Sequence, residues 1–209
     1  MDKPVIILGA GRIGQAAQAI FDSNGVIVYC FLDDDPDLKG TEINDISVLG
    51  TMDDESILRE IGERTEAFIA TDENSIRSTL VHMLQDRDIV PVNAIHKSSE
   101  VSKYAHLGHG NFIDSGSIIN SNMKLGNHCL VMSGSILDHN SHIKDFVQIG
   151  AGSLVGAGVS VGKSTFIGSG VTIVPGITIG NNARIGAGSV VIEDVKDNQT
   201  VFGNPAKSV

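Results

Sequence analysis

Tryptophan is absent from the 209 residues of this chain, and aromatic residues make up only 4% of it. Aromatic rings usually supply much of the bulk of a globular core, so aliphatic side chains have to fill this one. Glycine, in contrast, occurs 24 times, an excess that needs its own explanation. The hydrophobic fraction of 41% is sufficient for a buried core, which argues against a wholly disordered chain.

Basic runs, long apolar runs and paired cysteines are also missing. The chain has 15 Lys and Arg against 25 Asp and Glu, a net charge of −10, so it offers no electrostatic footprint for a nucleic acid. No apolar run approaches the roughly 20 residues that span a bilayer. The two cysteines, Cys30 and Cys129, lie far apart, which favours reduced thiols and a cytoplasmic protein.

The first part of the chain, residues 1–95, alternates strand-like and helix-like segments and is expected to form a small α/β domain. We expect strands at 5–8, 26–32, 46–49 and 67–70, and helices at 13–22, 53–61 and 75–85. Strands that alternate with helices in this way form a parallel sheet.

Residues 96–209 follow a six-residue period. Every sixth residue from Val101 to Val191, sixteen in all, is Ile, Leu or Val, and the residue after it is often Gly. This period fits neither an α-helix nor a hairpin and is typical of a parallel β-helix of hexapeptide repeats. Three hexads per coil give a little over five coils. Glycine suits tight corners, where a bulky Cβ would clash, and this explains its excess; the period does not fix the hand of the helix.

A glycine-rich loop links the first expected strand to the first expected helix. Its sequence, Gly9-Ala10-Gly11-Arg12-Ile13-Gly14 with Asp33 further on, fits a dinucleotide fingerprint, and the helix N-terminus favours a phosphate. NAD is the weaker interpretation because about 95 residues supply only half of a dinucleotide fold. A purely structural turn with a solvated acidic loop is the other interpretation.

The hexad run, together with its ending Gly203-Asn204-Pro205-Ala206-Lys207, resembles the left-handed β-helix acyltransferases. Three motifs extend the resemblance to the PglD/NeuD-type bacterial sugar acetyltransferases: Ile7-Leu8-Gly9-Ala10-Gly11, Phe31-Leu32-Asp33-Asp34 and Ile95-His96-Lys97-Ser98. The resemblance implies a Rossmann-like domain at 1–95 and a left-handed β-helix at 96–209. It also implies acetyl transfer from acetyl-CoA to the amino group of a nucleotide-linked sugar, in bacterial glycan biosynthesis. A homotrimer with active sites between subunits is the assembly that it implies.

The resemblance places the family's catalytic histidine at His139, where an imidazole suits a general base because its pKa lies near operating pH. Asn140 stands where the family usually has an acidic residue, and it can accept a hydrogen bond but brings no charge. Asp138 is the nearest acid, although its position next to His139 leaves its direction open. The Gly-rich corners around Gly150 and Gly152 are candidate sources of N–H donors for a tetrahedral oxyanion.

Two further sets of residues follow from the resemblance. The residues expected to bind the nucleotide sugar are Gly9, Ala10, Gly11, Arg12, Asp33, Asp34, Thr71 and Asp72. The residues expected to bind acetyl-CoA are Gln148, Gly150, Ala157, Ser169 and Ala187. No metal is expected, because the spacing of His106 and His109 converges poorly on a β-helix coil.

Two alternatives stay open at this point. One is an O-acetyltransferase that acts on a free sugar or a sialic acid. The other is a non-catalytic β-helix protein that binds a nucleotide sugar, an interpretation favoured by Asn140 and by Gln148, which stands where some family members have a second histidine. The sequence selects neither the sugar nor the nucleotide.

Overall fold

A computed structural model describes residues 3–209 of the chain. The chain divides into two compact units, the first ending at Lys97 and the second comprising Ser98–Val209. Among the helices of residues 3–209, none is long and apolar enough to cross a membrane.

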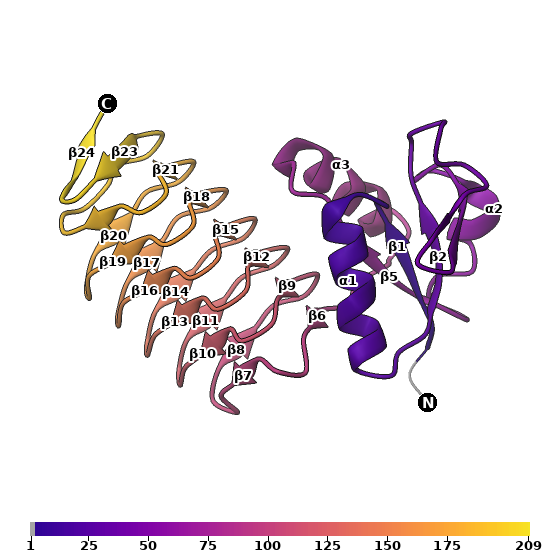
Figure 1. Cartoon of the computed structure of the whole chain (residues 1–209), viewed down its shortest axis with the longest axis horizontal. Helices are drawn as coiled ribbons and strands as arrows, with labels where there is room; N and C mark the ends of the chain where they lie inside the picture. Colours follow the sequence, from indigo (N-terminus) through magenta and orange to yellow (C-terminus); the bar gives the residue numbers. More distant parts are fainter. Residues whose placement is uncertain (1–2) are drawn as a thin grey trace. The chain divides into compact units, whose positions relative to one another are not determined.

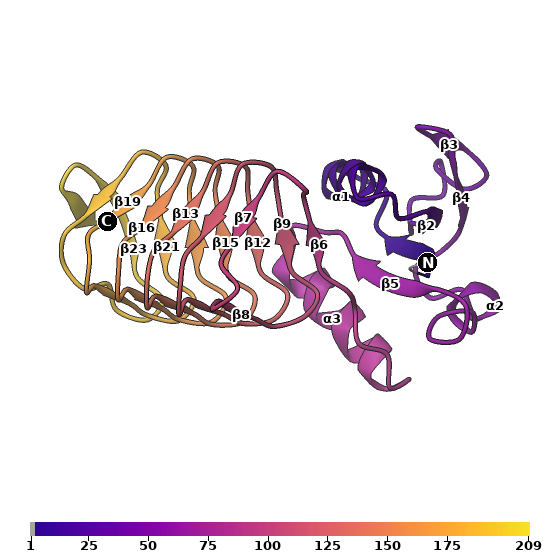
Figure 2. The same ribbon diagram turned by 90° about the horizontal axis from the view of Figure 1, so that it is seen from below.

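The first unit is a parallel α/β domain (Figure 1). Its elements are β1 (Val5–Leu8), α1 (Arg12–Ser23), β2 (Val28–Leu32), β3 (Glu42–Ile43), β4 (Ile46–Gly50), α2 (Glu55–Leu58), β5 (Glu66–Ile69), α3 (Asn74–Gln85) and β6 (Ala94–Ile95). The sheet order is β3-β4-β2-β1-β5, and β1 pairs in parallel with both β2 and β5. Figure 2 shows α1 and α3 on opposite sides of this sheet, so β1, buried at all four residues, forms the centre of the core.

Two local expectations for this unit were incomplete. The helix expected at 53–61 is only α2, a single turn that begins after Asp54, whose side chain accepts the Ser56 N–H. It ends early because Ile61 forms a bridge with Thr65 and Gly62 adopts a φ of +94°, a conformation that no helix continues. The short strand β3, antiparallel to β4, was not expected.

The second unit is a left-handed parallel β-helix (Figures 1 and 2). Its coil strands are β7 (Glu100–Val101), β8 (His106–Leu107), β9 (Phe112–Ile113), β10 (Ile118–Ile119), β11 (Lys124–Leu125), β12 (Leu130–Val131), β13 (Ile136–Leu137), β14 (His142–Ile143), β15 (Gln148–Ile149), β16 (Leu154–Val155), β17 (Ser160–Val161), β18 (Phe166–Ile167), β19 (Thr172–Ile173), β20 (Thr178–Ile179), β21 (Arg184–Ile185) and β22 (Val190–Val191). A closing hairpin, β23 (Thr200–Gly203) and β24 (Ala206–Ser208), follows them.

Three sheets run along this β-helix. They have the orders β22-β19-β16-β13-β10-β7, β20-β17-β14-β11-β8 and β21-β18-β15-β12-β9, the last extended by β23 and β24. In each coil strand the second residue is the inward aliphatic residue of the hexad, and it is buried in every coil from Ile113 onward. The six-residue period is therefore confirmed as the repeat of a β-helix.

Two rows of glycines serve different purposes in the coils. In the row directly after the inward residue, a Cβ would strike the next coil: at Gly162 it would lie 2.4 Å from the backbone nitrogen of Asn181. In the row three residues after the inward residue, the backbone is left-handed, as at Gly152 with a φ of +68°, and a Cβ there would meet nothing. The first row is set by close packing of coils and the second by conformation. Asn140, with a φ of +57°, belongs to the second row.

Candidate functional site

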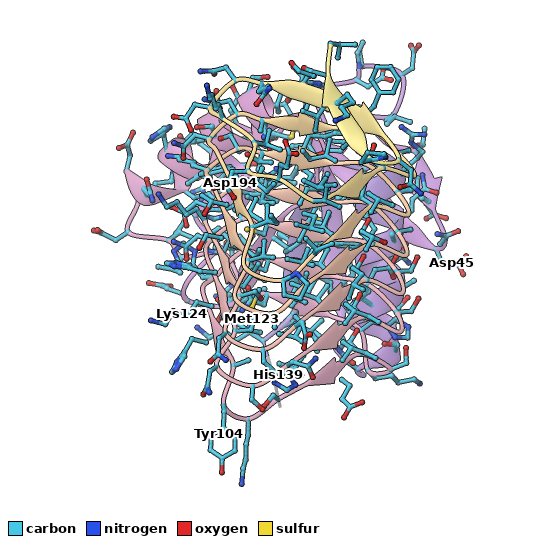
Figure 3. All side chains as sticks on the ribbon, turned by 90° about the vertical axis from the view of Figure 1, so that its left-hand side faces the viewer. Asp45, Tyr104, Met123, Lys124, His139 and Asp194 are labelled. Atoms are coloured by element: carbon cyan, nitrogen blue, oxygen red, sulfur yellow. The ribbon has the colours of Figure 1, made fainter. Side chains whose placement is uncertain are left out.

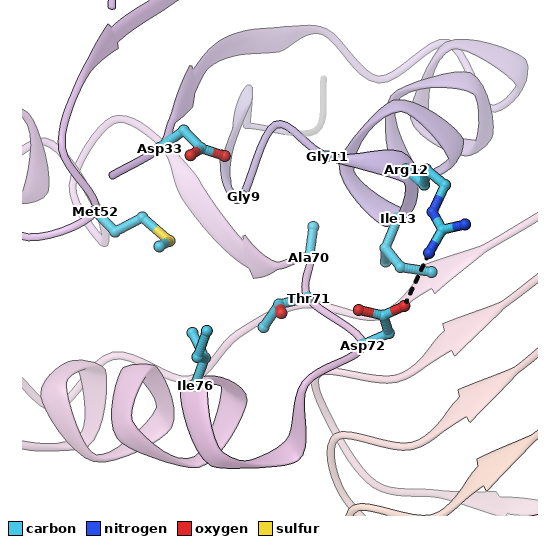
Figure 4. Close-up of a pocket in the computed structure, with 10 residues that line it drawn as sticks. All are labelled: Gly9, Gly11, Arg12, Ile13, Asp33, Met52, Ala70, Thr71, Asp72 and Ile76. Carbon is cyan, nitrogen blue, oxygen red and sulfur yellow. Dashed lines mark ion pairs between the residues drawn. The ribbon is translucent and has the colours of Figure 1, made fainter. Parts of the chain in front are cut away.

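A hollow of about 220 Å³ opens where the carboxyl ends of β1, β2 and β5 meet the start of α1 (Figure 4). Ligands of open parallel α/β sheets bind at this edge. The hollow collects six of the eight residues expected to bind a nucleotide sugar, namely Gly9, Gly11, Arg12, Asp33, Thr71 and Asp72. The structure does not bring Ala10 or Asp34 to its wall: Ala10 is buried, and the Asp34 carboxylate accepts the Met52 N–H at 2.8 Å.

The glycines of this loop fall into two kinds. A Cβ on Gly9 would lie 2.5 Å from the Ala70 carbonyl oxygen, so Gly9 allows β1 and β5 to approach closely. Gly11 is the residue before α1; in the described part of the chain no side chain caps the helix there, and a Cβ on Gly11 would have open space around it. The first-turn N–H groups of α1 therefore face the hollow beside a residue that leaves room for an anion.

Asp33 holds the loop in place. One carboxylate oxygen accepts the Ala10 N–H at 2.7 Å, and the other accepts the Asp35 N–H at 2.9 Å. Asp33 thus connects the end of β2 to the loop after β1, and it still lines the hollow. Opposite it, Arg12 and Asp72 form an ion pair at 3.8 Å with highly exposed side chains. Such a pair contributes little to stability, so the Arg12 guanidinium can reorient toward an anionic ligand.

Sequence reasoning missed three residues of this site. Met52 and Ile76 add apolar surface to the hollow. Arg77 lies behind it, fully buried, and donates hydrogen bonds to the Thr71 carbonyl oxygen at 2.6 Å and to the side-chain oxygen of Asn74. It therefore fixes the backbone that carries Thr71 and Asp72. No local motif marks Arg77, because its burial depends on how α3 packs.

His139 occupies the corner between β13 and β14, on the outside of the coils (Figure 3). Its side chain is 54% exposed, and Nε2 lies 3.6 Å from Oδ1 of Asp138. Asn140, the next residue, is exposed and donates its backbone N–H to the Ser121 carbonyl oxygen at 3.2 Å. The carboxylate beside the imidazole therefore comes from Asp138, the residue before His139.

The residues expected to bind acetyl-CoA lie along two different edges of the β-helix. Ala157 follows His139 by 18 residues and stands one coil further along the same edge, where the Gly158 N–H donates to the His139 carbonyl oxygen at 2.9 Å. Gly150, Ser169 and Ala187 follow the strands β15, β18 and β21 and line the next edge. Gln148 is half-buried on β15. A single chain thus does not gather this set at one place.

The corners around Gly150 and Gly152 were expected to supply an oxyanion donor, and the structure narrows the choice of N–H groups there. The N–H groups of Gly150 and Gly152 both donate to carbonyl oxygens of neighbouring coils, Ile167 at 2.8 Å and Ser133 at 2.9 Å. These two N–H groups belong to the hydrogen bonds between coils, whereas the Ala151 N–H between them has no acceptor among residues 3–209. The position two residues after the inward aliphatic residue is different. In residues 3–209 the structure gives no acceptor to the N–H of Ala157 at this position.

The two histidines considered as a metal pair have different surroundings. His106 is exposed on β8, whereas His109 packs edge-on against the His128 ring with centroids 4.8 Å apart. Across residues 3–209 no three His, Cys, Asp or Glu side chains gather in a way that could hold a metal ion.

Two family models match the sequence. Residues 4–84 match the PglD N-terminal domain, and residues 158–193 match the bacterial transferase hexapeptide (six repeats). No curated protein sequence gives a match.

Solved structures match both units together. PerB from Caulobacter crescentus, in complex with CoA and GDP-perosamine, is 30% identical with a TM-score of 0.88, covering 99% of this chain and 97% of that chain. A histidine-to-asparagine mutant of perosamine N-acetyltransferase from the same organism, with the same two ligands, is 29% identical with a TM-score of 0.91, covering 99% and 96%. The acetyltransferase domain of PglB from Neisseria gonorrhoeae, in complex with acetyl coenzyme A, is 25% identical with a TM-score of 0.92 and full coverage of both chains.

Proposed function

Since this chain belongs to the PglD/NeuD-type bacterial sugar acetyltransferases, we propose that it moves an acetyl group from acetyl-CoA to the amino group of a nucleotide-linked amino sugar. The general base in this proposal is His139. One observation carries it: an exposed imidazole with a carboxylate 3.6 Å away stands at a β-helix corner, in a chain similar over its whole length to an enzyme crystallised with CoA and GDP-perosamine.

The nucleotide part of the acceptor is assigned to the hollow of the first unit. Its phosphates would take the N–H groups at the start of α1, where Gly11 leaves space and Arg12 adds a positive charge. Met52 and Ile76 offer apolar contact for a nucleoside, and the Asp33 and Thr71 side chains offer hydrogen-bond acceptors. These features support a nucleotide sugar over a free sugar, which has no phosphate for the helix N-terminus.

The chemistry requires one proton acceptor and one oxyanion donor. As the acceptor amine attacks the thioester carbonyl carbon, His139 takes a proton from the nitrogen, which leaves a neutral amine to form the amide. The carbon–sulfur bond then breaks, and the imidazolium can return the proton to the departing thiolate. The Ala157 N–H, one coil from His139 and without an acceptor among residues 3–209, would stabilise the negative charge on the carbonyl oxygen.

A homotrimer explains why the coenzyme residues lie on two edges. In the sheet that contains β13, the outward positions hold Glu100, Ile118, Ile136, Leu154, Thr172 and Val190. In the sheet that contains β14, they hold His106, Lys124, His142, Ser160 and Thr178. The first of these is the apolar outward row, because Ile118, Ile136 and Leu154 follow one another in it, and it suits contact with a second copy of the chain. Such contact would place the edge of His139 in one subunit near the edge of Ser169 and Ala187 in another.

The direct test is a transfer assay on the purified protein. Acetyl-CoA is supplied with UDP-, GDP- and dTDP-linked amino sugars, and release of the free CoA thiol is followed. We expect transfer to one class of acceptor and loss of at least 100-fold of the rate in His139→Ala, consistent with the usual contribution of a general base. His142→Ala, which removes another exposed histidine on the same coil, is the matched control and should stay near the wild-type rate.

The same assay separates the alternatives. Release of thiol with hydroxyl sugars or sialic acid, and not with amino sugars, would favour O-acetylation. Tight binding of a nucleotide sugar without any thiol release would favour a non-catalytic binding protein. A His139→Ala variant that keeps most of its activity would remove His139 from the role of base.

A further inference from the structure

Asp138 has two roles at the corner that carries His139. Its Oδ1 accepts the His139 backbone N–H at 2.8 Å and the side-chain N–H of Asn120, from the coil before, at 3.0 Å. The same oxygen lies 3.6 Å from Nε2 of His139. Two hydrogen bonds therefore fix the carboxylate at the edge of the imidazole, and the side chain of Asp138 is only about one-third exposed.

We infer that Asp138, held by Asn120, is the residue that orients the His139 imidazole and stabilises it when it carries a proton, in place of an acid at position 140. This inference rests on the proposed function. A carboxylate at this distance stabilises an imidazolium. Nε2 is the ring nitrogen nearer to Asp138, so a hydrogen bond between them in the enzyme–substrate complex would leave Nδ1 for the acceptor amine.

The surroundings of His139 leave this role to Asp138. Neighbouring coils contribute Ser121 and Ala157 at the corresponding positions, and neither carries a charge. Lys103, two coils before His139 in the same row, has its ammonium 5.0 Å from the centre of the Tyr104 ring. Asn140, the next residue, is neutral. The ion-pair contact of His139 is with Asp138.

A second aspartate in the same β-helix makes it possible to distinguish the structural effect of the substitution on the turn from its effect on His139. Asp114 also stands directly after an inward residue, and its Oδ1 accepts the N–H of the next residue, Ser115, at 2.7 Å. Its neighbour is a serine rather than a histidine. Asp114→Asn therefore removes the same charge from the same kind of turn without affecting an imidazole, and it serves as the matched control.

The test compares Asp138→Asn with Asp114→Asn by steady-state kinetics. In Asp138→Asn we expect kcat to fall roughly 10- to 100-fold with KM for both substrates unchanged, as for a lost partner of a general base. A loss confined to kcat distinguishes a partner of the base from a residue that only holds the corner, because general damage to the corner would also raise KM. Asp114→Asn should match the wild type in both kcat and KM.

A rescue variant sharpens the result. Asp138→Asn combined with Asn140→Asp moves the carboxylate to the other side of His139, at a left-handed position that Asp tolerates, and should recover most of the lost kcat. The inference is overturned if Asp138→Asn keeps the wild-type kcat, if Asp114→Asn shows the same loss, or if the double variant recovers nothing. If His139→Ala loses transfer while Asp138→Asn is unaffected, the role of Asp138 is rejected and the proposed function stands. If His139→Ala stays active, the proposed general base itself is rejected.

Discussion

A Cβ atom added to Gly14 would lie 2.0 Å from the carbonyl oxygen of Gly9. The first turn of α1 therefore packs directly on the loop that follows β1, and only a residue without a side chain permits this contact. The position of the α1 N-terminus, and with it the set of N–H groups at the hollow, depends on the contact between these two glycines.

Gly14→Ala should for this reason damage both stability and ligand binding. The added methyl group forces the helix away from the loop, at a cost of roughly 1–3 kcal/mol in the free energy of unfolding. Urea denaturation measures this cost, and calorimetric titration with UDP, GDP and dTDP measures the binding. Gly11→Ala is the control for stability, since a Cβ there meets nothing within 4 Å. Equal stabilities of the two variants would contradict the close-packing argument.

Ala157→Pro should lower kcat with little effect on folding. Proline removes the N–H that is proposed to bind the oxyanion, and the fold accepts proline in this position because Pro175 occupies the corresponding place one coil further along. Loss of one oxyanion donor usually costs roughly 100- to 1,000-fold in kcat. Thermal denaturation and steady-state kinetics test the two parts of the prediction.

Ser133→Pro is the control for this substitution. It changes the same hexad position on a different edge of the β-helix, so it reports the cost of proline in the coil without removing the proposed donor. A similar fall in kcat for both variants would argue against Ala157 as the donor.

The sequence predicted the β-helix well because one inward aliphatic residue in six is a direct record of the coil. The inward residues of the hexads from Ile113 to Val191 are all buried, as expected. It could not distinguish the two glycine rows, since close packing and left-handed backbone both select glycine. The sequence also left open where the Asp138 side chain points. The orientation of a corner side chain depends on the neighbouring coil, here on Asn120. Arg77 was missed because only tertiary packing of α3 buries it.

Leu154→Arg should dissociate the proposed homotrimer. Leu154 is 37% exposed in the middle of the apolar outward row, and a buried guanidinium without a partner is costly at an interface. Light scattering after size-exclusion chromatography should show a mass that falls from three chains to one, and acetyl transfer should fall with it. Ser160→Arg, on the polar sheet, should leave the mass unchanged. A wild-type protein that is monomeric at assay concentration would reject the trimer.

Cys30 should make stability fall at alkaline pH. Burial in β2 raises the pKa of its thiol from 9.0 to about 12, so the native state keeps the proton between these values while the unfolded state loses it. The stability that the protonated Cys30 thiol contributes is complete below pH 9 and is lost as the pH rises from 9 toward 12. The free energy of unfolding falls by at most about 1.4 kcal/mol per pH unit over this range. Urea denaturation at pH 8, 9 and 10 of the wild type and of Cys30→Ala measures it. Tyrosines and lysines titrate in both proteins, so the difference between the two curves isolates the thiol. Parallel curves would show that Cys30 ionises as readily in the native state as in the unfolded state.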